Sequence, residues 1–322
     1  MNAGDLVLRR GRGQLAELHL HFEGSLDVGV LNRLGRRLGL ADLPPGSLRI
    51  SGWDDGERAF GAVLARLRDA GGYADAVRAV RARLVREGIC YAEMSVMPVI
   101  HVGLGVAFAE LWRGMAEGLA EGLAEGGPCL RVLFAVPRNA GAAAGFETLR
   151  LIEQAGHAGI VGIDLAGTEA EGTIAPFAPV FDAARAMGLR TAAHAGEFGP
   201  AARVRETLRL LRPDRIGHGL AAVDDADVLA ELSDSGVPVD LSPRGNVAFG
   251  AVTSLAAHPL RRLFEAGVPI TISTDDPVLV GTTLSAELDL LEDEFGLSAA
   301  EAAGVAGNGL RYAFALPDRV AA

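Results

Sequence analysis

Short apolar runs alternate with longer amphipathic runs along most of this chain. Each short run is followed at once by polar residues, which is typical of a buried strand that ends at a surface. These predicted strands occupy residues 17–22, 90–97, 130–137, 161–165, 190–194, 215–218, 238–241 and 269–274. Between them, apolar residues recur at helical spacing over residues 106–125, 145–158, 176–187, 201–211 and 224–235.

Repeated alternation of strand and helix predicts an α/β protein built as a (β/α)8 TIM-like barrel. An open doubly wound sheet is the alternative, but no Gly-rich phosphate loop follows the first predicted strand. The stretch 26–88 is too long for one crossover and indicates extra helices near 28–38, 57–69 and 74–86. We expect this insertion to cover the C-terminal mouth of one barrel domain spanning residues 1–322, although a separate small domain there is an alternative.

Composition narrows the choice of partners and location. The chain has 322 residues, with 30 basic against 41 acidic side chains and a formal charge of −11. This balance argues against nucleic acid or an anionic membrane as a partner, and no apolar run reaches the roughly 18 residues of a membrane span. Residues 1–12 lack the apolar core of a signal peptide, and Cys90 and Cys129 form no disulfide framework. A cytoplasmic location is therefore expected.

Polar residues that can carry chemistry gather after the predicted strands. His19 and His21 lie on the first strand, and three later strands end in His194, His218 and the pair Asp275-Asp276. In a (β/α)8 barrel these strand ends meet at one mouth, where active sites lie. The alternative interpretation is that the histidines are structural and that the two acids belong to a solvated turn. The other three histidines are placed in loops or helices: His101, His157 and His258.

The residue types at this mouth are those of a zinc site. His19 and His21 are two apart, so their side chains leave a strand on the same side and can hold one ion. Three imidazoles and one carboxylate, from His19, His21, His194 and Asp275, make a plausible zinc shell. His218 could orient or deprotonate a zinc-bound water, and Glu197 is placed to protonate a substrate.

The absence of one residue type decides the number of metal ions expected. Every one of the 30 basic residues is Arg, so no carboxylated lysine can bridge two metals. We therefore expect one zinc ion per chain.

Six sequence blocks resemble the adenosine deaminase family of the amidohydrolase superfamily, in family order along nearly the whole chain. They are LHLHFEGS (18–25), YAE (91–93), GIDLAG (162–167), HAGE (194–197), RIGHG (215–219) and STDDP (273–277). The combination of the HAGE, GHG and TDDP blocks is highly specific. The resemblance implies zinc-dependent hydrolytic deamination of a 6-aminopurine nucleoside, such as adenosine or aminodeoxyfutalosine, to the 6-oxopurine with release of ammonia.

The resemblance also implies a role for each matched residue. The zinc ligands would be His19, His21, His194 and Asp275, with Asp275 counted among the catalytic residues as well. Glu197 would protonate N1 of the purine, and His218 would assist the attacking water. Asp276 would hydrogen-bond N7, and the backbone N–H of Gly167 would reach N3.

Departures from the family pattern cluster away from these positions. Glu23 stands where adenosine-specific members usually have Asp, which implies a substrate contact for Glu23 on the side of the ribose 5′ group. Ser95 replaces a common Arg, and Thr168 replaces an Asp. After the seventh strand the usual Cys-Pro-x-Ser-Asn is here Ser242-Pro243-Arg244-Gly245-Asn246. Arg244 could pair with an anionic group of the substrate, with a surface Arg beside a turn as the alternative.

Three functional alternatives remain open from the sequence. The first is an adenine deaminase, and the second is a deaminase of another amino-heterocycle on the same mononuclear zinc site. The third is a non-catalytic barrel that binds purine or metal, against which the intact Glu197 and His218 argue. The partner expected from the sequence is a small-molecule purine, and the oligomeric state is left open.

Overall fold

The computed structural model describes residues 14–124, 127–169 and 173–316. Its strands all belong to one eight-stranded sheet. They are β1 (Leu15–His21), β2 (Ile89–Val96), β3 (Cys129–Pro137), β4 (Ile160–Ala166), β5 (Arg190–Ala195), β6 (Arg215–His218), β7 (Val239–Leu241) and β8 (Ile270–Ile272). Each lies where the alternating pattern predicts it.

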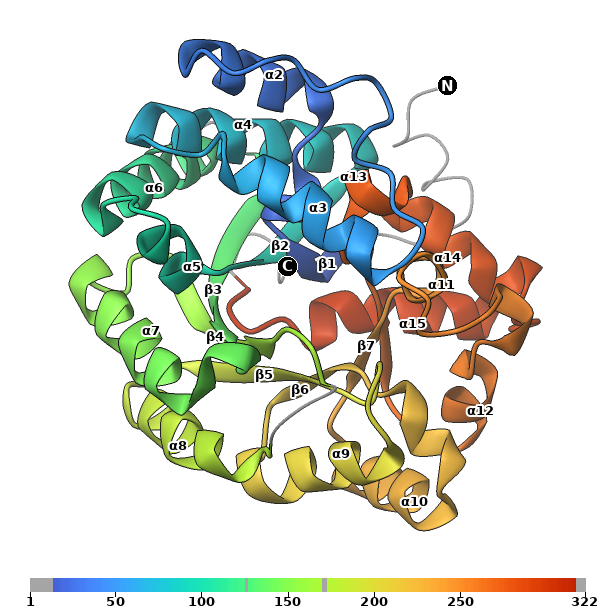
Figure 1. Cartoon of the computed structure of the whole chain (residues 1–322). Coiled ribbons are helices and arrows are strands. Elements are labelled where there is room, and N and C mark those ends of the chain that lie inside the picture. The colour runs from blue at the N-terminus through green and yellow to red at the C-terminus, as the bar shows by residue number, and fades with distance from the viewer. Residues whose placement is uncertain (1–13, 125–126, 170–172, 317–322) are drawn as a thin grey trace.

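The sheet is a nearly closed barrel (Figure 1). Each strand pairs in parallel with the next in the chain, from β1 to β8. The two end strands meet through a bridge between Leu20 and Asp275. The backbone N–H of His21 donates to the Asp275 carbonyl (2.8 Å), and the Asp275 N–H donates to the carbonyl of His19 (3.1 Å). The predicted (β/α)8 TIM-like barrel is confirmed.

Helices surround this barrel (Figure 1). They are α2 (Val28–Arg37), α3 (Trp53–Leu64), α4 (Ala70–Glu87), α5 (Pro98–Gly103), α6 (Phe108–Ala124), α7 (Gly141–Ala155), α8 (Ala178–Ala186), α9 (Ala201–Glu206), α10 (Ala226–Ser235), α11 (Pro243–Ala248), α12 (Leu260–Glu265), α13 (Pro277–Val280), α14 (Leu284–Asp293) and α15 (Ala299–Arg311). The last residue of the helix predicted over 106–125 lies outside the described residues, as do residues 1–13. None of the described helices combines the length and apolar character needed to span a lipid bilayer.

The stretch between β1 and β2 contains three helices, α2, α3 and α4. Asp27 caps the start of α2 and Asp69 that of α4, each accepting a hydrogen bond from a backbone N–H of the first turn. Helix α3 begins at Trp53, four residues before the predicted start, because acidic Asp54 and Asp55 favour a helix N-terminus.

The interior of the barrel contains a buried guanidinium group, that of Arg215. Arg215 on β6 is fully buried, and its guanidinium bonds Glu93 (2.7 Å) and Asp240 (2.5 Å). A buried cation is tolerated only when paired in this way. The centroid of the Phe314 ring lies 4.0 Å from the guanidinium carbon, so the segment after α15 covers Arg215.

Candidate active site

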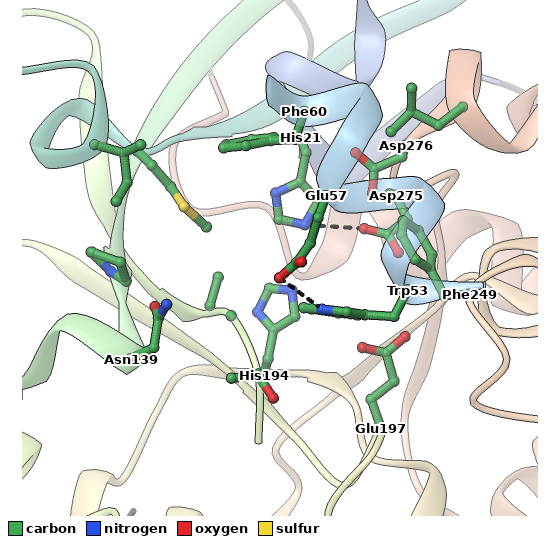
Figure 2. A pocket seen from close by; sticks show the side chains of 18 of the residues that line it. His21, Trp53, Glu57, Phe60, Asn139, His194, Glu197, Phe249, Asp275 and Asp276 are labelled. Carbon is green, nitrogen blue, oxygen red and sulfur yellow. Dashed lines mark hydrogen bonds and ion pairs between the residues drawn. The ribbon is translucent and has the colours of Figure 1, made fainter. Parts of the chain in front are cut away.

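A cavity of about 270 Å³ opens where the strands end at their carboxyl side. Its wall contains residues at or after the carboxyl ends of all eight strands, together with residues of α3. Figure 2 shows His21 and His194 near the centre of this cavity, with Trp53, Glu57 and Phe60 reaching in from α3.

Three of the predicted ligand atoms lie close together. His19 and His21 leave β1 on the same side, and their Nε2 atoms are 3.3 Å apart. Asp275 Oδ1 is 3.0 Å from Nε2 of His21 and 3.4 Å from Nε2 of His19. Ligand atoms of His19, His21 and His194 also lie within 4.8 Å of one another. The fold therefore brings together residues separated by more than 250 positions in the chain.

Carboxylates lie behind two of the histidine rings, and one of them is at hydrogen-bond distance. Asp164 Oδ1 is 3.2 Å from Nδ1 of His194, and Ser95 donates to the other oxygen of Asp164 at 3.0 Å. Asp240 lies 4.0 Å from Nδ1 of His19. A carboxylate on Nδ1 leaves Nε2 free as the ligand atom, which is a common arrangement around protein metal sites.

The rings can approach this closely because β6 carries a glycine beside them. A Cβ on Gly217 would lie 2.9 Å from Cε1 of His19 and 3.2 Å from Cγ of His194. Any side chain there would push the imidazoles apart.

The loop after β8 is fixed by hydrogen bonds to β1. Ser273 Oγ accepts from the backbone N–H of His19 (3.0 Å), and the N–H of Thr274 donates to Glu17 Oε1 (3.1 Å). The next residue, Asp275, has a φ of 62°, which is strained for a residue with a side chain. Strain of this kind costs about 1–3 kcal/mol and persists only where surrounding contacts impose it.

Three of the four predicted ligands, His19, His21 and Asp275, have the spacing of zinc ligands, and His194 lies beside them. A tetrahedral zinc with bonds of about 2.0–2.1 Å to nitrogen holds its ligand atoms roughly 3.3 Å apart. The three separations among His19, His21 and Asp275 are 3.0, 3.3 and 3.4 Å. Asp275 Oδ1 is buried and accepts no hydrogen bond from the described residues, so this donor atom is available to a cation.

Glu197 enters the same cavity from the segment after β5. Its backbone N–H and that of Gly196 donate to the two carboxylate oxygens of Glu169, at 2.9 and 2.7 Å. Its Oε1 accepts a hydrogen bond from Asn246 Nδ2 (3.0 Å). Burial, with the charges of Asp275 and Glu169, raises the pKa of Glu197 well above its ordinary value. A carboxyl group in this environment holds a proton and can act as a general acid.

His218 faces Glu197 at the end of β6. Its Nε2 lies 3.4 Å from Glu197 Oε2, and its Nδ1 is 3.1 Å from Asn246 Nδ2. Burial, and then the neighbouring His19, lowers the pKa of His218 well below its ordinary value, so the ring is neutral. Its φ is 67°, a second strained residue of the site.

The predicted substrate contacts divide into two groups. Gly167 and Asp276 line the cavity. Burial and the charge of Asp275 raise the pKa of Asp276 to about 7. A Cβ on Gly24, in the LHLHFEGS block, would lie 1.7 Å from Asp276 Oδ1. Glycine at this position therefore leaves room for the Asp276 carboxyl group.

Glu23 and Arg244 are not among the residues that line the cavity. Glu23 is buried, and its Oε1 lies 2.9 Å from Nε2 of His101, whose Nδ1 is 2.8 Å from the Tyr73 hydroxyl. The Arg244 side chain is 41% exposed, with Nε 3.6 Å from Oε1 of the buried Glu287.

Several residues of the site had no role assigned from the sequence. Asp164, Glu169 and Asn246 hold the site through hydrogen bonds, and Trp53 and Glu57 belong to the cavity wall. Asp164 stands inside the GIDLAG block, which was the available signal for it. No sequence motif indicates Glu57, because its position in the cavity wall depends on how α3 packs against the barrel.

Comparison with known proteins bears directly on this site. The family described as Adenosine deaminase matches residues 14–322. The chain belongs to the adenosine deaminase family. Membership confirms the resemblance carried by the six sequence blocks.

Individual members of the family are similar over most of the chain. An adenine deaminase of Rhizobium meliloti (strain 1021) is 33% identical over 289 residues, covering 89% of each chain. An aminodeoxyfutalosine deaminase of Acidothermus cellulolyticus is 34% identical and covers 85% of this chain and 81% of its own. The crystal structure of an adenine deaminase from Arthrobacter aurescens superposes with a TM-score of 0.88 at 31% identity, covering 95% of both chains.

Proposed function

We propose that this member of the adenosine deaminase family is a zinc-dependent hydrolase that removes the 6-amino group of an adenine-type purine. One zinc ion per chain would be held by His19, His21, His194 and Asp275. The observation that carries the proposal is a single cavity lined by three of these residues, His21, His194 and Asp275, together with Glu197. Glu197 is a carboxyl group whose pKa is raised well above its ordinary value.

Bound zinc would lower the pKa of a water molecule toward neutrality and so supply the nucleophile. The chain's own residues handle the protons and hold the ring. Glu197 would give its proton to N1 of the purine and take one from the attacking water, whose oxygen bonds to C6, and His218 would hydrogen-bond that oxygen. The second water proton goes to the amino nitrogen, the C6–N bond breaks, and ammonia and the 6-oxopurine are released.

The purine edge would lie against two residues of the cavity wall. The backbone N–H of Gly167 would donate to N3, and Asp276 would hydrogen-bond N7. Both residues line the cavity.

The wall of the cavity indicates which purines it accepts. Trp53, Phe60 and Phe249 supply aromatic surface, and Glu57 adds an acidic group. No arginine is present among the described residues that line the cavity. A substrate with a phosphate or carboxylate would therefore find no cation to pair with, whereas adenine and uncharged nucleosides meet no such obstacle. Because most of the similar relatives are named adenine deaminase, adenine is the first substrate to test.

The aminodeoxyfutalosine deaminase among the relatives supports a 5′-modified nucleoside as the second candidate. An assay of zinc-loaded protein against adenine, adenosine, 5′-deoxyadenosine and methylthioadenosine distinguishes the two, with AMP and aminodeoxyfutalosine, which carries a benzoate, added as anionic comparisons. We expect ammonia from adenine or a neutral nucleoside and the lowest kcat/KM for AMP. Absence of ammonia from every compound, with zinc measured at one per chain, would show that the proposal is wrong.

A further inference from the structure

Asn246 is a buried amide that contacts both residues to which we assign proton handling. It lies on α11, and its Nδ2 is 3.0 Å from Glu197 Oε1 and 3.1 Å from His218 Nδ1. Its side chain is completely inaccessible to solvent. The orientation of this one amide therefore decides what hydrogen bonds Glu197 and His218 receive.

His258 determines that orientation. The backbone N–H of Leu260, at the start of α12, donates to His258 Nδ1 at 3.2 Å. A backbone N–H can only donate, so Nδ1 carries no proton. Burial lowers the pKa of His258 to about 4, so the ring is neutral and its single proton is on Nε2. His258 Nε2 lies 3.1 Å from Asn246 Oδ1 and donates to it.

The carbonyl end of the Asn246 amide thus faces His258, and its NH2 group faces the site. One N–H donates to Glu197 Oε1 and the other to His218 Nδ1. Both donors of the amide NH2 group are therefore used. A ring nitrogen that accepts such a bond cannot carry a proton, and a protonated carboxyl group accepts preferentially through its carbonyl oxygen, which leaves the proton on the other oxygen.

We propose that His258 and Asn246 are positioning residues that fix the proton of Glu197 on Oε2 and the proton of His218 on Nε2. These two atoms face each other at 3.4 Å. The inference rests on the proposed deaminase function, and it makes His218 a hydrogen-bond donor toward the attacking oxygen, in place of a base that takes its proton.

Nuclear magnetic resonance of the zinc-loaded protein tests the proposal without activity. Protein labelled with ¹⁵N-histidine reports, in long-range ¹H–¹⁵N spectra, which ring nitrogen of each histidine carries the proton. The variants His258→Gln and His218→Gln assign the two signals by their loss. We expect both rings to be neutral with the proton on Nε2 at pH 7. Either ring protonated on Nδ1, or a cationic His258, would overturn the proposal.

Kinetics of variants provide the second test. Asn246→Ala and His258→Leu should lower kcat about tenfold or more, a part of the usual gain from general acid catalysis, with KM and zinc content unchanged. His258→Gln keeps a donor for the amide and should recover part of the loss. The control Asn308→Ala removes an amide that donates to the Ile270 carbonyl of β8 (2.8 Å), and its kcat should stay within about twofold of wild type.

Full kcat in Asn246→Ala, or equal losses in His258→Leu and His258→Gln, would overturn the proposal. Failure of the proposed function has a different signature. In that case the wild-type protein would release no ammonia from any 6-aminopurine, while the histidine spectra would still decide whether the two positioning residues act as inferred.

Discussion

At the scale of single residues, Glu197 combines burial with two neighbouring carboxylates, Asp275 and Glu169, which keep its proton bound. Glu197→Gln preserves the shape of the side chain but cannot deliver a proton to the substrate. We expect kcat to fall by about 10²–10⁴, the usual contribution of a general acid, while the zinc content stays at that of wild type. Steady-state rates and metal analysis of the same preparation check both. Wild-type kcat in this variant would remove Glu197 from the mechanism.

Glu57 gives a second prediction at this scale, because it is the residue of α3 that adds negative charge to the cavity wall. Its Oε1 accepts a hydrogen bond from Trp53 Nε1 (3.2 Å), which holds the carboxylate in place. Glu57→Arg should raise kcat/KM for AMP relative to adenosine by about fivefold or more, equivalent to about 1 kcal/mol. The exposed Asp54 on the same helix does not line the cavity, so Asp54→Arg is the matched control. If Glu57→Arg and Asp54→Arg raised kcat/KM for AMP relative to adenosine equally, the cause would be the net charge of the protein and not the cavity wall.

At the scale of elements, the site depends on how closely β6 lets the rings of β1 and β5 approach. Gly217→Ala introduces a Cβ that would lie 2.9 Å from a ring carbon of His19. We expect about 1–3 kcal/mol lower free energy of unfolding and a zinc affinity reduced about tenfold or more. Gly61→Ala on α3 is the control, because a Cβ there meets no atom within 4 Å. Chemical denaturation and competition with a metal chelator measure the two effects, and wild-type zinc affinity in Gly217→Ala would contradict the account.

Helix α14 provides a pH-dependent test. Burial raises the pKa of Glu287 from 4.5 to about 7, although Thr282 and the backbone N–H of Arg244 donate to its carboxylate. Because the folded state binds this proton more tightly than the unfolded state, the stabilising contribution is complete below the unfolded pKa and is lost as pH rises through the folded value. The loss amounts to about 3 kcal/mol.

The variant Glu287→Gln cannot ionise, so its free energy of unfolding should decline less between pH 5 and pH 8, by about 2–3 kcal/mol relative to wild type. Urea denaturation at several pH values measures the difference between the two proteins. Parallel curves over this range would show that Glu287 does not titrate between the two states.

At the scale of the whole molecule, much of the barrel could be predicted because the information is local. Each strand is a short apolar run, and the polar residues that follow the runs identify the mouth at which His19, His194 and Asp275 meet. Helix α3 begins four residues before its predicted start, since helical spacing of apolar residues does not reflect the preference of Asp54 and Asp55 for a helix N-terminus.

The hydrogen-bonding partners of the site could not be predicted in the same way. The contact between Ser95 and Asp164 joins residues 69 positions apart on different strands, and His258 reaches Asn246 across the turn that precedes α12. Such pairs depend on how the strands and loops pack, which no local pattern records. For the same reason the sequence does not show that the Glu23 carboxylate lies against His101. Its contact with a substrate stays a prediction.

The most direct test of the central claim is a zinc titration of metal-free protein, followed by the rate of ammonia release from adenine, or from the best substrate if another is preferred. We expect the rate to rise in proportion to added zinc and to level off at one equivalent per chain, since His19, His21, His194 and Asp275 form one ligand set. A full rate before any zinc is added, a plateau only at two equivalents, or no ammonia at any zinc content would contradict this claim.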